Sequence, residues 1–178
     1  SFGLPQDRRL ILFGAQAVDD PRKGIGLLRR ALELLRDQGS HDDVDLVIFG
    51  SSRPEEPPDF AFESHYTGYV HDDATLASLY AACDVMVVPS KFEAFGQTVT
   101  ESMACGTPVV GFDATGPQDT IEHGHTGYLA EPYDTDDLAE GIGWVLDASE
   151  LRTTLGEQAR ARAVEQYDIE TVAHQYHA

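Results

Sequence analysis

The feature that most constrains the fold of this chain is an alternation of short apolar runs with helical patterns. The clearest run is Val85 to Val88, bounded by Asp84 and Pro89. A short, unbroken run of this kind is typical of a strand buried on both faces, as strands of parallel sheets are. Parallel strands need crossover connections, and amphipathic stretches separate the runs. The sequence therefore predicts an α/β fold with a mostly parallel sheet.

The alternation continues along the whole chain. Strands are expected near residues 10–13, 45–49, 66–70, 85–88, 108–112 and 128–129. Helices are expected near residues 25–37, 73–83, 98–104 and 135–146, and mostly helical structure from 150 onward with a break near 167–168. Asp72 or Asp73 is expected to cap the second helix. Because no repeat, low-complexity segment or linker divides the sequence, residues 1–178 are expected to form one doubly wound domain.

The charge of the chain excludes some classes of partner. Its 31 acidic residues against 12 basic ones give a net charge of −19, which disfavours nucleic acid and anionic membrane surfaces. Lys23 and Lys91 are its two lysines. Many acids with few lysines stay soluble in high salt, so a halophilic source is a hypothesis.

Localisation is also predicted from the apolar pattern. No apolar run approaches the roughly 20 residues that cross a bilayer, and no signal peptide is recognisable. The sequence begins at Ser1 rather than at methionine, so we expect the natural protein to be longer. A cytoplasmic location is expected.

Several residues that could bind a metal are interpreted as structural. Cys83 and Cys105 lie in small apolar contexts without a CxxC partner, which favours buried free thiols in a reducing compartment. His123 and His125 flank a glycine and are interpreted as loop residues; Trp144 is interpreted as a packing residue. Acidic pairs are interpreted as solvated loop or helix-start acids: Asp42 with Asp43, and Asp136 with Asp137.

The most informative segment is VPSKFEAFGQTVTESMACGTPVV, residues 88–110. It predicts that a buried strand ends, a loop crosses the carboxyl edge of the sheet, and a helix begins at Gly96, Gln97 and Thr98. Ligands of open α/β sheets bind at this edge. A helix start offers unpaired N–H groups to a phosphate, and a glycine there lets the backbone approach closely.

Two carboxylates flank the predicted helix start. Glu93 precedes the helix and Glu101 lies about one turn inside it. They can therefore contact different parts of one ligand, and a carboxylate is a strong acceptor for sugar hydroxyls. The alternative to a ligand site is that Glu93 is an ordinary loop carboxylate and Glu101 a solvated helix residue. The whole string, rather than either residue alone, favours a ligand site.

With these motifs the sequence closely resembles the C-terminal domain of glycosyltransferase family 4, a retaining family with two Rossmann-like domains, the GT-B fold. The resemblance rests on the string Pro-Ser-x-x-Glu-x-Phe-Gly…Glu-x-x-Ala-x-Gly-x-Pro-Val-Val and on Gly-His-Thr-Gly-Tyr-Leu at 124–129 followed by Pro132. It covers nearly the whole chain. It implies that residues 1–178 are the nucleotide-sugar-binding half, and that an N-terminal acceptor domain is absent here.

The resemblance implies a role for each residue of the string. Glu93 would hold hydroxyls of the donor hexose, and Glu101 would accept hydrogen bonds from the ribose. Backbone N–H groups would bind the sugar and pyrophosphate at the start of the helix, from Phe95, Gly96 and Gln97, with Thr98 next.

The resemblance also implies cationic and base-binding residues elsewhere. Lys23 resembles the lysine of a Lys-Gly pair that neutralises the departing diphosphate, and Val70 lies where the family contacts the base through its backbone. The family usually has an arginine just after the first strand, where this chain has Ala15. Arg22 or Lys91 could replace that cation, or it could be missing.

The implied activity is that of a retaining hexosyltransferase in polysaccharide or glycoconjugate biosynthesis. It would need no metal or cofactor, and Glu93 would position the hexose rather than act as a nucleophile. The isolated domain should be inactive, and any contact with the inner membrane would be peripheral and made through the missing domain. The alternatives are a non-catalytic nucleotide-sugar-binding module and a GT-B epimerase or phosphorylase relative.

Overall fold

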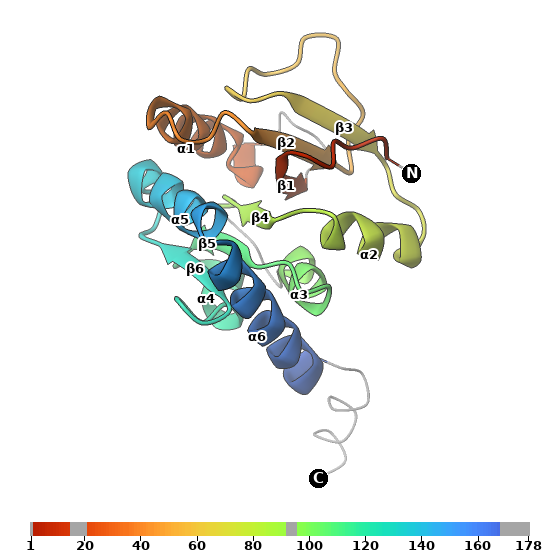
Figure 1. Cartoon of the computed structure of the whole chain (residues 1–178), viewed down its shortest axis with the longest axis vertical. Coiled ribbons are helices and arrows are strands. Elements are labelled where there is room, and N and C mark those ends of the chain that lie inside the picture. Colours follow the sequence, from red (N-terminus) through yellow and green to blue (C-terminus); the bar gives the residue numbers. More distant parts are fainter. Residues whose placement is uncertain (1, 15–20, 92–95, 168–178) are drawn as a thin grey trace.

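The structure is a computed structural model that describes residues 2–14, 21–91 and 96–167 (Figure 1). Its centre is a six-stranded parallel sheet in the order β3-β2-β1-β4-β5-β6. The strands are β1 (Arg9–Gly14), β2 (Val44–Phe49), β3 (Ser64–Gly68), β4 (Val85–Val88), β5 (Val109–Phe112) and β6 (Gly127–Ala130). This order reverses direction at β1, so the predicted doubly wound α/β fold is confirmed.

Helices cover both faces of the sheet (Figure 1). They are α1 (Ile25–Asp37), α2 (Asp73–Ala81), α3 (Gln97–Ala104), α4 (Thr115–Thr120), α5 (Thr135–Asp147) and α6 (Ser149–Tyr167), with a 3-10 turn η1 (Pro21–Lys23) before α1. Helices α1 and α5 share one apolar core with the sheet, α2 and α3 share the other, and α6 contributes side chains to both.

The central strands β2, β1, β4 and β5 are mostly apolar because each contributes side chains to both cores, whereas the edge strand β3, with the sequence SHYTG, is only half-buried. In β1, Ile11 and Phe13 pack with α1 and α5, whereas Leu10 and Leu12 pack on the opposite face. All four side chains are buried. Alternating residues of a strand point to opposite faces, so a strand covered on both sides has no polar face.

The third strand ends earlier than its sequence predicts. The predicted range ran to Val70, but β3 ends at Gly68, whose φ of +71° turns the chain out of the sheet. The Gly68 carbonyl still accepts a hydrogen bond of 2.9 Å from the N–H of Gly50. Val70 therefore lies in the loop between β3 and α2, half-buried against the second core.

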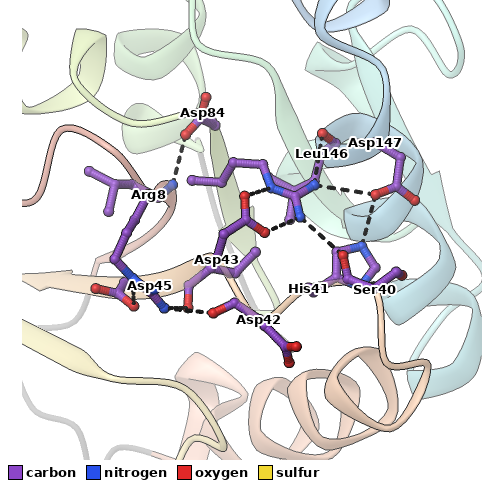
Figure 2. A network of polar contacts seen from close by, with 12 residues as sticks. Arg8, Ser40, His41, Asp42, Asp43, Asp45, Asp84, Leu146 and Asp147 are labelled. Carbon is purple, nitrogen blue, oxygen red and sulfur yellow. Dashed lines mark hydrogen bonds and ion pairs between the residues drawn. The ribbon is translucent and has the colours of Figure 1, made fainter.

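Arginines tie together the segments at the amino edge of the sheet (Figure 2). Arg8 donates to the buried Asp45 carboxylate at 2.6 Å, and Arg9 pairs with Asp43 and Asp147. The hydrogen bond that Arg9 donates to Asp43 lowers the pKa of the Asp43 carboxyl. Asp43 is exposed in the turn before β2, which agrees with the prediction of a solvated loop acid, and its charge also joins β1 to that turn.

Other acids and histidines have structural contacts as well. The carboxylate of Asp137 accepts hydrogen bonds from the Tyr128 hydroxyl at 2.6 Å and from the Glu131 N–H at 2.7 Å. The Nδ1 atom of His123 accepts from the Leu129 N–H at 3.1 Å, which agrees with a loop histidine. Within the described ranges, no helix has the length and apolar character that a membrane span requires.

Candidate functional site

Two loops at the carboxyl edge of the sheet are locked against one another. Gly24 has φ +72°, and a Cβ atom added there would lie 1.8 Å from the carbonyl oxygen of Pro89. The backbone N–H of Lys91 donates to the carbonyl of Arg22 at 2.9 Å. The loop after β1 and the loop after β4 therefore meet through backbone atoms. This contact brings Arg22, Lys23 and Lys91 to one part of the edge.

The basic residues precede the first turn of α1. Arg22 and Lys23 belong to η1, and Gly24 is the N-cap of α1 without a side-chain capping bond from the described residues. Lys23 is half-buried, and Arg22 is exposed. Cations at a helix N-terminus oppose the helix dipole, whereas an anion is stabilised by both the cations and the dipole. The arrangement therefore suits an anionic ligand.

The start of α3 offers a second set of anion-binding groups. Gly96 is its N-cap at φ +53°, and no side chain of the described segments caps the helix. The Gly96 carbonyl accepts from the N–H groups of Val99 and Thr100 at 2.7 and 3.0 Å. The first N–H groups of a helix, here those of Gln97 and Thr98, lack acceptors within the helix. Such groups bind phosphates and other anions.

Glu101 lies one turn further along α3 and faces α2. Its carboxylate accepts a hydrogen bond of 2.9 Å from the hydroxyl of Tyr80. A pocket of about 380 Å³ lies between the two helices. This is within the range of small-molecule sites, which begins near 300 Å³. Its lining is formed by Asp73, Leu76, Ala77, Tyr80, Gln97, Glu101, Ala104 and Cys105.

The predicted site residues thus fall into three groups. Arg22, Lys23 and Lys91 meet at the loop contact, and residues 96–101 form the start of α3 with Gly96, Gln97, Thr98 and Glu101. Val70 is separate, in the loop before α2. Glu93 and Phe95 lie outside the described residues, as does Ala15, so their roles stay predictions.

Tyr80 is a site residue that the sequence did not reveal. It lies in a helix among small apolar residues and resembles any core aromatic residue. One signal was available, because a buried tyrosine hydroxyl usually requires a hydrogen-bond partner. Its burial and the nearby Glu101 carboxylate raise the pKa of Tyr80, so the hydroxyl keeps its proton and donates.

The two cysteines are free, and their thiols differ in exposure. Cys83 is buried, as predicted, and burial raises the pKa of its thiol to about 12. Cys105 is only half-buried and lines the pocket beside Glu101, so that part of the prediction is wrong. Burial also raises the pKa of Cys105. A raised thiol pKa disfavours the nucleophilic thiolate at neutral pH.

Comparisons with known proteins indicate the family to which the chain belongs. The family model for glycosyl transferases group 1 matches residues 1–162. The chain is 33% identical over 178 residues to the phosphatidyl-myo-inositol mannosyltransferase of Mycolicibacterium smegmatis, covering 97% of this chain and 45% of that protein. It is 40% identical over 101 residues to the N-acetyl-alpha-D-glucosaminyl L-malate synthase of Bacillus anthracis, covering 57% and 26% respectively.

A solved structure agrees with this family. The sucrose-phosphate synthase from Thermosynechococcus elongatus superposes with a TM-score of 0.79 at 30% identity, over 98% of this chain and 45% of that chain. The chain spans less than half the length of these three proteins. The six-stranded sheet and its two helical layers correspond to one Rossmann-like half of a GT-B fold. The chain belongs to the group 1 glycosyl transferases.

Proposed function

We propose that this chain is the donor-binding domain of a retaining hexosyltransferase, which binds a nucleoside-diphosphate sugar and positions its anomeric carbon for transfer. One observation carries the proposal. The sequence from Lys91 to Glu101 connects the basic loop contact, a helix start that no side chain of the described residues caps, and a carboxylate in a pocket. A nucleoside-diphosphate sugar needs this combination, because it joins a dianionic pyrophosphate to polyhydroxy sugars on both sides.

The parts of the donor can be assigned to separate groups. The pyrophosphate would accept hydrogen bonds from the N–H groups of Gln97 and Thr98. Lys23 would neutralise its charge, and Arg22 or Lys91 would replace the cation that is missing at Ala15. The backbones of the two loops that hold the three basic residues contact each other before the ligand arrives, so little reorganisation of these loops is needed when charge develops on the leaving diphosphate.

The sugars and the base would lie on either side of the pyrophosphate. Glu101 would accept hydrogen bonds from the ribose hydroxyls in the pocket between α2 and α3. Glu93, with the backbone of Phe95 and Gly96, would hold the hexose. The base would contact the backbone near Val70, beside the start of α2.

Transfer would proceed on the front face of the donor, with retention. The bond from the anomeric carbon to the diphosphate breaks while the acceptor oxygen bonds to the same carbon, and the leaving phosphate takes the acceptor proton. Glu93 would position the hexose. The acceptor substrate would bind to an N-terminal domain, which corresponds to the part of the relatives that this chain does not cover. Any membrane contact would also be made by that domain. The names of the relatives, a mannosyltransferase and a glucosaminyl L-malate synthase, support glycosyl transfer as the overall activity.

Calorimetric titration of the chain with UDP, GDP, ADP and their hexose conjugates tests this proposal. One of the three nucleotides should bind, and Glu101→Ala should weaken its binding about tenfold or more, since a charge-assisted pair of hydrogen bonds is lost. Glu140→Ala is the control, because Glu140 is exposed on α5, on the opposite face of the sheet. Absence of binding, or binding that Glu101→Ala leaves unchanged, would refute the proposal.

A second experiment separates an enzyme from a binding module. Joining the chain to the N-terminal domain of a relative, or to its own, should restore transfer from the nucleotide sugar that binds. Binding without transfer in the joined protein would favour the non-catalytic module.

A further inference from the structure

Tyr80 occupies a fixed place beneath the pocket. Its side chain is 1% exposed, and its ring makes an edge-to-face contact with Phe49, with centroids 5.6 Å apart. Its backbone is held as well, since its carbonyl accepts from the Thr107 hydroxyl at 2.7 Å and from the N–H of Cys83 at 3.1 Å. The end of α2 is thereby tied to the turn after α3. The Tyr80 hydroxyl is consequently a donor whose position is set by the core.

The partner of this rigid donor is the Glu101 carboxylate. The hydrogen bond of 2.9 Å reaches Oε2, while the carboxylate also lines the pocket. A carboxylate can accept about four hydrogen bonds, so one bond to Tyr80 leaves capacity for a ligand. A glutamate on a helix surface otherwise samples several rotamers, and ordering it upon binding costs side-chain conformational entropy. The bond from Tyr80 supplies that order before any ligand binds.

We infer that Tyr80 is a positioning residue that holds the Glu101 carboxylate in the orientation that receives a vicinal diol of the ligand. This inference rests on the proposed function, in which Glu101 binds the ribose. The two hydroxyls of a ribose lie on neighbouring carbons, so a carboxylate of fixed orientation can accept from both at once. Tyr80 does not touch the ligand through this role. It acts by orienting the Glu101 carboxylate, to which it donates a hydrogen bond.

Tyr80→Phe tests the inference because it removes one oxygen and keeps the ring. The Phe49 contact and the backbone bond to Thr107 remain, so the fold should be retained, and thermal unfolding checks this. The probes are the nucleoside diphosphate that binds most tightly among UDP, GDP and ADP, and its 2′,3′-dideoxy analogue. Tyr80→Phe should weaken the ribonucleotide about 3- to 10-fold and leave the dideoxy analogue unchanged.

Two further variants separate positioning from packing. Tyr66→Phe is the matched control, because the Tyr66 hydroxyl is also buried but has no hydrogen-bond partner among the described residues. Its loss should change neither the affinity for the ribonucleotide nor that for the dideoxy analogue. In the double variant Tyr80→Phe with Glu101→Ala, the tyrosine substitution should have no further effect beyond Glu101→Ala alone. The double variant also relieves any destabilisation caused by an unpaired Glu101.

The outcomes distinguish this inference from the proposed function. A loss of affinity that is equal for the ribose and dideoxy compounds would show a packing effect and overturn the inference. Unchanged ribonucleotide binding by Tyr80→Phe, with a clear loss in Glu101→Ala, would overturn only the inference. Failure of every nucleotide to bind the wild-type chain would overturn both.

Discussion

At the scale of single residues, Gly24 links the architecture of the chain to its proposed chemistry. Its positive φ and its approach to the Pro89 carbonyl each exclude other residues, for different reasons. A left-handed conformation costs an L-residue about 1–2 kcal/mol, and a Cβ atom at 1.8 Å from an oxygen forces the backbone to move. The contact therefore determines how the Lys23 loop meets the loop after β4.

Gly24→Ala should separate these two loops. We expect a loss of stability of more than about 2 kcal/mol and at least tenfold weaker binding of nucleoside diphosphate, because Arg22 and Lys23 move away from Lys91 and the loop after β4. Gly39→Ala is a matched control, since Gly39 has a similar φ of +76° but nothing within 4 Å of an added Cβ. It should cost only about 1 kcal/mol and leave binding unchanged. Chemical denaturation and calorimetry measure both effects, and equal behaviour of the two variants would contradict the explanation.

At the scale of helices and strands, the amino edge and the carboxyl edge of the sheet hold different kinds of contact. The amino edge holds ion pairs between arginines and acids, and the carboxyl edge holds the loops of the candidate site. The Arg9–Asp43 pair joins the start of β1 to the turn before β2. Because its folded pKa is lowered, Asp43 contributes stability above the ordinary pKa of an aspartate, and the contribution disappears as pH falls through the lowered value.

Asp43→Asn should therefore destabilise the chain at pH 7 by about 0.5 kcal/mol, an amount typical of exposed ion pairs. The difference from wild type should shrink as the pH falls below the ordinary aspartate range, and also in high salt. Asp42→Asn is the neighbouring control, since it is the backbone carbonyl of Asp42, not its carboxylate, that accepts from Arg8. Urea unfolding at several pH values provides the measurement. A pH-independent difference would exclude the ion pair as its cause.

The sequence predicted elements whose apolar pattern is regular. Val85 to Val88 and the helix at 25–37 have the bounds that were expected, because one is an unbroken apolar run and the other has leucines at helical spacing. Helix α4 was not predicted, since its six residues TGPQDT have no such spacing and include glycine and proline. The Gly24–Pro89 contact and the Tyr80–Glu101 bond join residues far apart in sequence, and a local pattern has no information about such pairs.

At the scale of the whole molecule, charge is the dominant property. A net charge of −19 on 178 residues makes the folded chain repel itself, and salt screens that repulsion. The arginines at the amino edge neutralise only their immediate neighbours. Stability should therefore depend on ionic strength more than in a balanced protein.

We expect the melting temperature to rise by about 5 °C or more between low and molar KCl, which corresponds to roughly 1–2 kcal/mol for a domain of this size. Differential scanning calorimetry measures the change. Sucrose at equal osmolality is the control, because it stabilises compact states without screening charge. A flat or falling melting temperature in KCl would count against the halophilic hypothesis.

The separation of the two edges also matters for protein engineering. The buried Asp45 and its arginine anchor the scaffold at the end of the strands farthest from the loops after β1 and β4. Loops exchanged between relatives would leave these anchors untouched, provided that the glycine facing Pro89 is transferred together with its partner segment. Under the proposed function, donor preference could then be redesigned by grafting matched pairs of loops, rather than single loops, onto an unchanged framework.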